Sequence, residues 1–458
     1  MSDFSGLNIA LTGLYASQRA LMVTGQNVTN ANTDGYSREA VDLEPVDGVF
    51  GPSLWTNNSS APGGGVSVTG VTRFRAEYLE VNAALARGAQ SQLSTSSATL
   101  SSIETMFGEP SDDSLAAGLD GLWSSFAAVA NNPSDPGARA ALLAQGTTVA
   151  STFNSMSSQL TQLSSDSLSQ LSALTSEINT TAANIASLNG QIGQATLSGS
   201  DPSALEDQRD SLVQQLATDA GATVRPGANG TVNVFVGGSA LVSGQQAETL
   251  ALDTSGSSVS LDWVNAGHAA LVTSGTAGGL LNTINTVVPG YQQSLNTVAM
   301  QLKSDVNTLH SAGVGLDGST GLNFFDGTSA ADISLSADVA GQPDKIAAGA
   351  ASGGSLDGSV ALQLSDLGQS ATGADAQYRA LIANLGVDSQ GAQRNSTMQD
   401  ATVQQIDASR QSVSGVNTDE EMVSMVQFQN AYNASARFLT TIDQMLDTLV
   451  NHTGVVGM

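Results

Sequence analysis

The chain contains 458 residues, of which 41 are acidic and 14 basic, so its formal net charge is −27, and it has no cysteine. A chain this acidic is not attracted to phosphate backbones or anionic lipid, which argues against nucleic-acid binding and a membrane-surface role. The lack of cysteine excludes disulfides, thiol catalysis and Cys-type metal sites, and the length allows about three domains at roughly 150 residues each.

The N-terminal segment has the pattern of an amphipathic helix. Apolar side chains alternate at spacings of three and four, the heptad pattern of a helix that packs against another helix, with Gln18 and Gly25 as weak positions. The N-terminal seam is defined by these apolar positions: Phe4, Leu7, Leu11, Leu14, Leu21 and Val28. Residues 30–36, which include Asn30, Asn32 and Gly35, predict the turn that ends the helix.

The interior of the chain is predicted to be mostly helical, because long segments are rich in Ala, Leu, Ser and Gln. The predicted helices cover 78–107, 137–198, 203–218 and 280–310. Pro289 is expected to kink or restart the last of them. Residues 221–274 instead show short alternating runs between Gly pairs and Asp/Ser/Gly clusters, which predict an inserted antiparallel β domain. Residues 313–370 predict loops with short strands.

The C-terminal segment repeats the heptad pattern of the N-terminus. The C-terminal seam is defined by Met425, Phe428, Tyr432, Leu439, Ile442, Leu446 and Leu449. Ser435 is its only polar position, and Asn417 or Thr418 is expected to cap the start of the helix. Both ends of the chain therefore carry an apolar face suited to helix–helix packing.

No catalytic residue, cofactor site or metal site is expected. Residues 313–318 match GxGxxG, but they follow a predicted helix, whereas a dinucleotide site needs a strand there, so we interpret them as a surface loop. Asp317, Asp326 and Asp332 lack the spacing of an EF-hand, and the histidines form no metal-binding pattern. Neither a membrane-spanning stretch nor a Sec-type signal peptide is predicted.

Two N-terminal segments resemble a known family. Residues 11–21 read LTGLYASQRAL, and residues 27–38 read NVTNANTDGYSR. Together they are similar to the N-terminal signature of bacterial flagellar axial proteins, which are the rod, hook and hook-associated proteins. The family usually has Ile-Ala where this chain has Val28-Thr29, and often Pro at the position of Asp34.

Further segments resemble the hook-associated branch of this family. They are residues 65–73, 78–79, 132–139, 205–212, 414–422, 427–437 and 442–446. The resemblance covers nearly the whole chain in the right order and is weakest over 221–275 and 315–370. It implies a mainly α fold with an inserted β domain. The expected domains are an inner coiled coil (1–45 and 412–458), a long helical-bundle middle domain (46–220 and 276–411, with the loop-rich segment 313–370) and a small antiparallel outer β domain (221–275).

The resemblance also implies a function. The chain would be a structural adaptor, not an enzyme, at the junction between the flagellar hook and the filament. Its partners would be further copies of itself in a ring, the hook protein below, and the next junction protein and filament above. The subunit would be exported through the flagellar type III channel without a cleavable signal, with an export chaperone on the C-terminal helix, and would be extracellular. Alternatives are another axial protein, hook or distal rod, or a secreted enzyme on an axial scaffold.

The candidate assembly residues combine the seams with the N-terminal motif. The motif comprises Leu11, Leu14, Leu21, Asn27, Asn30, Asn32, Gly35 and Tyr36. Its polar members have two open interpretations: contacts between subunits, or a helix stop that only shapes the inner domain. The C-terminal seam is the candidate surface for assembly and for the chaperone. Because a lone helix of this length is marginal in water, we expect both termini to order on incorporation.

Overall fold

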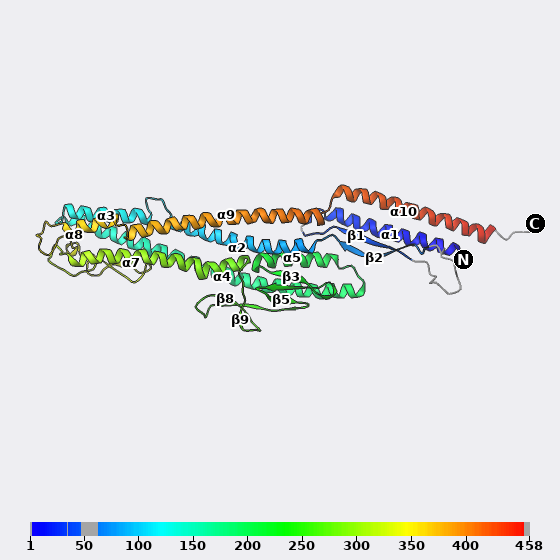
Figure 1. Cartoon of the computed structure of the whole chain (residues 1–458), viewed down its shortest axis with the longest axis horizontal. Coiled ribbons are helices and arrows are strands. Elements are labelled where there is room, and N and C mark those ends of the chain that lie inside the picture. The colour runs from blue at the N-terminus through cyan, green and yellow to red at the C-terminus, as the bar shows by residue number, and fades with distance from the viewer. Residues whose placement is uncertain (1, 34, 47–62, 453–458) are drawn as a thin grey trace, which may run out of the picture.

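The computed structural model describes residues 2–33, 35–46 and 63–452. The molecule is an elongated bundle of helices with both chain termini at one end and small β-sheets on its flank (Figure 1). This arrangement confirms the predicted mainly α fold with an inserted antiparallel β segment. Among the described helices, none is both long enough and apolar enough to cross a membrane.

The end that holds both termini is the inner unit, which consists of two helices and a β-hairpin. Its elements are α1 (Ser2–Asn30), β1 (Glu39–Pro45), β2 (Val66–Arg73), α10 (Thr418–Asp447) and the π-helical turn η5 (Thr448–His452). The strands pair antiparallel, with a bulge between Asp42 and Leu43. Asn417 caps α10 by accepting a hydrogen bond from the backbone of Asp419, as predicted. The hairpin was not predicted, and the expected domain boundary at residue 45 falls inside it.

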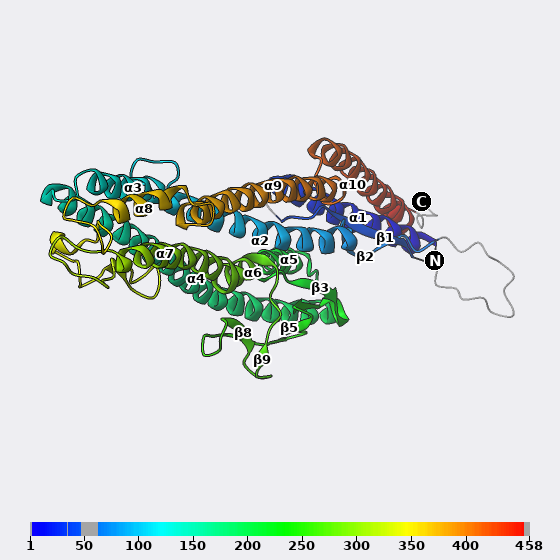
Figure 2. The same ribbon diagram turned by 60° about the vertical axis from the view of Figure 1, so that its left-hand side comes forward.

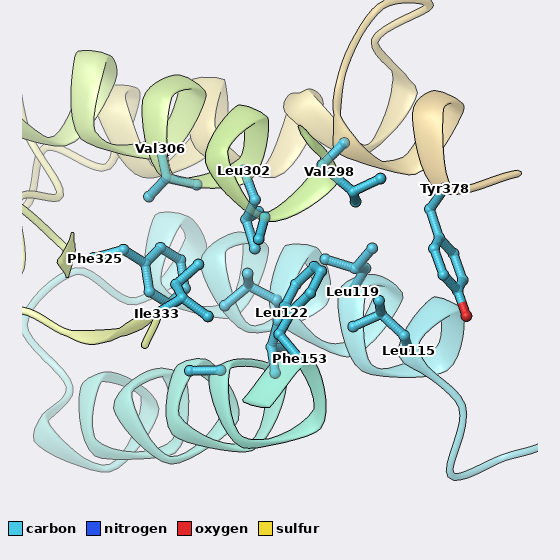
Figure 3. Close-up of a cluster of buried hydrophobic side chains, with 14 of the residues drawn as sticks. Leu115, Leu119, Leu122, Phe153, Val298, Leu302, Val306, Phe325, Ile333 and Tyr378 are labelled. Atoms are coloured by element: carbon cyan, nitrogen blue, oxygen red, sulfur yellow. The ribbon is translucent and has the colours of Figure 1, made fainter. Parts of the chain in front are cut away.

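The rest of the molecule is a long rod of helices. They are α2 (Glu77–Phe107), α3 (Leu115–Asn131), α4 (Pro136–Ser198), α5 (Ser203–Ala220), α6 (Gly275–Asn282), α7 (Val288–Ala312), α8 (Ser359–Asp366) and α9 (Ala374–Ser414). Figure 2 shows α9 running beside α2, above α7 and α4. At the far end, Leu119, Phe153 and Leu302 meet from three different helices in one apolar core (Figure 3).

A π-helical turn replaces the break predicted at Pro289. The turn η2 (Thr283–Val287) connects α6 to α7 without interruption. Pro289 lies just after this turn, and because it has no backbone N–H it cannot donate to the preceding turn of the continuous helical run. The helix therefore restarts at α7 through a local change of helical pitch, without a loop.

The β segment packs on the rod and shares an apolar core with it. Its strands are β3 (Thr223–Pro226), β4 (Val232–Val236), β5 (Ser239–Ser243), β6 (Gln246–Ala247), β7 (Leu250–Asp253), β8 (Ser260–Trp263) and β9 (His268–Ala269). They form antiparallel sheets in the orders β3-β4-β5-β6 and β7-β8-β9, with the 3-10 turn η1 (Ala228–Gly230) between β3 and β4. Val234 and Trp263 from these sheets join Ile178 of α4 and Leu216 of α5 in one cluster.

The loop-rich segment also contributes to the main core. It contains β10 (Phe325–Asp326), β11 (Ser334–Leu335) and the 3-10 turns η3 (Pro343–Lys345) and η4 (Leu367–Gln369). Phe324, Phe325 and Ile333 are fully buried against α3, α4 and α7. The glycine-rich residues 313–318 follow the end of α7 as a turn, in which Gly315 N–H donates to the carbonyl oxygen of Ser319. The segment is irregular in backbone but anchored by its side chains.

Asp219 near the end of α5 carries an energetic penalty that a single substitution can remove. Its Oδ2 atom is buried without a hydrogen-bond partner in the described part of the chain. Burial, with a smaller contribution from the charge of Glu177, raises the pKa of Asp219 from 3.8 to about 6. Since the folded state holds the proton more tightly than the unfolded state, the protonated carboxyl stabilises the fold below pH 3.8. This stabilisation is lost as the pH rises towards 6.

Asp219→Asn is therefore expected to raise the free energy of unfolding by roughly 1–2 kcal/mol at pH 8, after allowance for solvent screening, with almost no change at pH 3.5. Chemical denaturation at both pH values measures this difference. Asp112→Asn, at an exposed site, is the control for the loss of one negative charge. Equal effects of the two substitutions at pH 8 would show that Asp219 carries no local penalty.

Candidate assembly surfaces at the chain termini

The two terminal helices pack against each other in antiparallel directions. Asn27 of α1 contacts Glu421 at the start of α10, whereas Gly6 of α1 lies against Ile442 near the end of α10. A Cβ atom added to Gly6 would lie 3.2 Å from Cδ1 of Ile442, and one added to Gly13 would lie 3.1 Å from Oγ of Ser435. The helices approach closely because α1 presents small residues to α10.

The C-terminal seam lies on the face of α10 that contacts α1. Ile442 is 3% exposed. The half-buried members of the seam are Met425, Phe428, Tyr432, Leu439 and Leu446. Leu449 is 49% exposed. The C-terminal seam is thus at least half-buried along most of α10.

Within the subunit, the most buried face of α1 is offset from the N-terminal seam. The buried positions of α1 are Ala10, Ala16, Ser17, Ala20, Val23, Thr24 and Asn27. Of the predicted seam, Leu7, Leu14, Leu21 and Val28 are half-buried and Leu11 is 38% exposed, while the side chain of Phe4 lies outside the described residues.

The physical reason for this difference is the size of the contacting side chains. The heptad rule locates large apolar residues, but α1 contacts α10 and the β-hairpin through small ones, which permit a short distance between backbones. The large side chains of α1 flank this contact. Tyr15 and Met22 add to Leu11 on this flank, with exposed fractions of 60% and 52%. The subunit therefore leaves an apolar stripe of α1 uncovered.

Asn27 is the centre of a buried hydrogen-bond network inside the inner unit. Its Nδ2 donates to the carbonyl oxygen of Glu39 at 2.8 Å and to Oε2 of Glu421 at 3.0 Å. Its Oδ1 accepts from the backbone N–H of Glu39 at 3.0 Å and from the hydroxyl of Tyr36 at 2.8 Å. Arg38 completes the network by donating from Nε to Oε1 of Glu421 at 2.7 Å. The network ties α1, β1 and α10 together.

Burial and neighbouring carboxylates shift the ionisation of this network. Burial first, and then the charges of Asp201 and Asp207, raise the pKa of Glu39 against a weaker opposing hydrogen bond from Ser203. Burial, followed by the charge of Glu39, also raises the pKa of Tyr36, so its hydroxyl stays protonated as a hydrogen-bond donor. These shifts keep the Tyr36 hydroxyl protonated, so the network can hold the inner unit together.

The remaining motif residues form the turn after α1. Asn30 accepts a hydrogen bond from Thr33 Oγ1 at 3.2 Å and donates to the carbonyl oxygen of Gln26. Gly35 has a φ of +82°, a left-handed conformation that favours glycine. Asn32 is exposed. The structure thus brings Asn27 and Tyr36 together inside the subunit and leaves Asn32 at the surface.

A second exposed apolar set lies on α10. Met422, Val423 and Val426 project from the first turns of the helix, and Phe438 and Met445 flank the C-terminal seam further along. The heptad pattern does not include these positions, so it does not mark them as an exposed surface. Grouped exposed apolar side chains are typical of interaction surfaces. The inner unit therefore presents uncovered apolar side chains on both of its helices.

Comparisons with known proteins identify the family. The family model for "Flagellar hook-associated protein FlgK helical domain" matches residues 100–325, and that for "Flagellar basal body rod FlgEFG protein C-terminal" matches residues 408–451. Flagellar hook-associated protein 1 of Bacillus subtilis (strain 168) is 30% identical over 511 aligned positions, which cover 100% of this chain and 99% of the relative. The protein of the same name from Escherichia coli (strain K12) is 25% identical over 548 positions, with 97% and 99% coverage.

A solved structure shares the fold. "The structure of the flagellar hook junction protein FlgK from Burkholderia pseudomallei" matches with a TM-score of 0.65 at 19% identity, over 74% of this chain and 100% of that one. The alignment with the Escherichia coli relative runs over 548 positions, more than the 458 residues here, so that relative contains segments that this chain lacks. The full-length similarity to the Bacillus subtilis protein shows that the chain belongs to the family of flagellar hook-associated protein 1.

Proposed function

We propose that this chain is the structural adaptor that joins the flagellar hook to the filament, and that copies of it assemble into a ring through the inner unit. The observation that carries the proposal is the apolar stripe Leu11, Tyr15 and Met22, which one subunit leaves exposed beside the packed α1–α10 pair. A heterologous contact between copies would cover this stripe and close a ring. The proposal is supported by the names of the relatives, which are hook-associated or hook junction proteins.

The two alternatives are less well supported. The model that matches residues 408–451 is named for rod and hook proteins, so α10 does not distinguish the members of the superfamily. The match over 100–325, by contrast, is specific to hook-associated protein. A secreted enzyme on an axial scaffold would need an independent catalytic domain. The β segment instead shares its apolar core with α4 and α5, which supports a structural role.

The neighbours and the export route belong to the same proposal. Hook protein would contact the ring below, and the next junction protein and filament above. The subunit would travel through the flagellar type III channel without a cleavable signal and function outside the cell. An export chaperone would bind α10 through the C-terminal seam. Because α1 covers Phe428 and Ile442 in the folded subunit, this contact requires α10 to be separated from α1.

Both terminal helices are proposed to become fully ordered only on incorporation. Ordering the backbone costs about 1–2 kcal/mol per residue, and α1 and α10 bury only one face each within the subunit. Neighbouring copies would bury the exposed stripe and supply the missing stabilisation. Equal protease resistance of the terminal helices in the free subunit and in the assembled ring would contradict this part of the proposal.

Deletion of residues 412–458 in the native host is expected to abolish attachment of the filament to the hook. A sharper test replaces only exposed side chains, with Leu11→Ser and Met22→Ser combined, because neither is part of the buried core of the subunit. We expect secretion of filament subunits without attached filaments, scored by electron microscopy. Leu197→Ser, at a 77% exposed position on the rod, is the matched control and should leave attachment intact. Normal filaments on the deletion strain would overturn the proposed function.

A further inference from the structure

The inner unit is connected to the rod without a shared apolar core. Within residues 2–33, 35–46 and 63–452, neither of the two large apolar clusters includes a residue of α1, β1, β2 or α10. The backbone joins the two bodies through short links, residues 74–76 between β2 and α2 and residues 415–417 between α9 and α10. Apolar burial therefore does not fix the angle between the inner unit and the rod.

We call the region where the inner unit meets the rod the joint. Its contacts are made by charged side chains rather than by apolar ones. Arg73, the last residue of β2, pairs with Asp207 at 2.6 Å and with Asp210 at 3.2 Å, both on α5. Its Nη2 also lies 2.7 Å from Glu206. The backbone N–H of Ser37, in the loop before β1, donates to Oδ2 of Asp207 at 3.2 Å. These contacts hold the hairpin end of the inner unit against α5.

The same set of charges reaches α2 and α9. Arg75 in the link pairs with Glu80 of α2 at 2.7 Å and with Asp210. Arg410 of α9 pairs with Glu80 at 2.8 Å from the other side. We define the joint cluster as Arg73, Arg75, Glu80, Asp207, Asp210 and Arg410. The side chains of the cluster are 12–19% exposed.

The joint cluster contains three arginines and three carboxylates, so its positive and negative charges balance. Burial alone would raise the pKa of Glu80, but the hydrogen bond from Arg410 and the charge of Arg75 outweigh it and hold that pKa below its usual value. In a chain with a net charge of −27 and only 14 basic residues, placing three arginines here is a concentrated use of positive charge. The cluster thus pairs three of the arginines with three carboxylates at one position in the fold.

We propose that the joint cluster is an electrostatic latch that sets the angle of the inner unit to the rod, and that screening or neutralising it lets the inner unit swing while both bodies stay folded. Ion pairs weaken as the ionic strength rises, although less at sites as buried as these, whereas apolar cores do not weaken. Each body keeps its own stabilising contacts, the Asn27 network in one and the apolar clusters in the other. This inference does not depend on the proposed function.

The lack of native cysteine makes the latch directly measurable by spin labels. Gln26→Cys on α1 and Asn184→Cys on α4 are exposed positions on the two bodies. Pulsed electron spin resonance on the full chain is expected to give one narrow distance at low salt. At about 1 M salt, where the Debye length of about 3 Å is comparable to the separation of the paired charges, the distribution should become about twofold wider. Asn184→Cys with Thr402→Cys, both on the rod, is the reference pair and should stay narrow throughout.

Arg73→Gln should produce the wide distribution already at low salt. Arg379→Gln is the matched control, because Arg379 carries the same charge at an exposed position near the start of α9, whereas the joint lies at the other end of that helix. It should leave the distribution narrow. The salt titration uses the natural joint and so tests the latch even where Arg73→Gln folds poorly. A Gln26–Asn184 distribution that stays narrow up to about 1 M salt would overturn the latch.

Discussion

Replacing Arg139 with leucine is expected to lower the free energy of unfolding of the rod by about 3 kcal/mol. Arg139 is 1% exposed at the start of α4. Its Nε donates to the carbonyl oxygen of Pro133 at 2.6 Å, and its Nη1 donates to those of Ile346 at 2.7 Å and Pro343 at 3.1 Å. Leucine would remove the donor to the carbonyl oxygens of Pro133 and Ile346, at about 1–3 kcal/mol for each buried one. The carbonyl oxygen of Pro343 would keep the backbone N–H of Ile346 as its donor.

Two opposing effects decide the size of this loss. Burial lowers the pKa of Arg139, which shows that the guanidinium is held at an energetic cost, and its removal offsets part of the loss. The lost hydrogen bonds outweigh that gain because they anchor a segment distant in sequence, residues 343–346, to α4. Without them the loop-rich segment loses its attachment beside the apolar core that contains Phe324 and Ile333.

Chemical denaturation of the full chain measures the effect of Arg139→Leu. Arg139→Lys keeps the charge but offers a single donor group in place of the planar guanidinium, so we expect an intermediate loss. Arg379→Leu, at an exposed position on α9, is the matched control and should change stability by less than about 0.5 kcal/mol. An Arg139→Leu chain as stable as the control would show that the carbonyl contacts contribute nothing net.

Arg139 and its partners show which features of the fold the sequence predicts and which it does not. Apolar periodicity predicted α2, α4, α5 and the α6–α7 run to within a few residues, because a helix is set by local contacts. Arg139 lies in a segment that resembles the family, but its partners Pro343 and Ile346 are about two hundred residues further along the chain. No local pattern indicates such a contact. Likewise, residues 313–370 contain no long apolar stripe, yet Phe325 is fully buried by helices distant in sequence.

Of the two candidate surfaces at the termini, one could be predicted from the sequence and the other could not. The C-terminal seam follows from its large side chains, and the structure places it against α1. The contact face of α1 did not follow, because Ala10, Gly13 and Ala20 have too little apolar surface to stand out in a heptad. The hairpin escaped prediction because β2 begins about twenty residues after β1 ends, without a short turn signal between them. Long-range pairing, not propensity, creates both features.

Asn27→Ala is expected to loosen the inner unit by about 3 kcal/mol while leaving the rod unchanged. The side chain of Asn27 is 1% exposed and satisfies both backbone groups of Glu39, the hydroxyl of Tyr36 and the carboxylate of Glu421. Alanine removes the amide and leaves the backbone groups of Glu39 and the hydroxyl of Tyr36 without this partner in a buried site, while Glu421 keeps its contact with Arg38. Hydrogen exchange should then speed up about 100-fold in α1 and α10, since each 1.4 kcal/mol corresponds to about a factor of ten.

Asn32→Ala provides the matched control, because Asn32 is an exposed asparagine of the same motif. It should leave exchange in α1 and α10 at the parental rate. The comparison also decides between the two interpretations of the polar motif. Because Asn27 lies wholly inside the subunit, we expect its loss to impair filament attachment only in step with the faster exchange. If Asn27→Ala abolished attachment while exchange in α1 and α10 stayed at the parental rate, Asn27 would be a contact between subunits. The hydrogen-bond network would then not be its principal role.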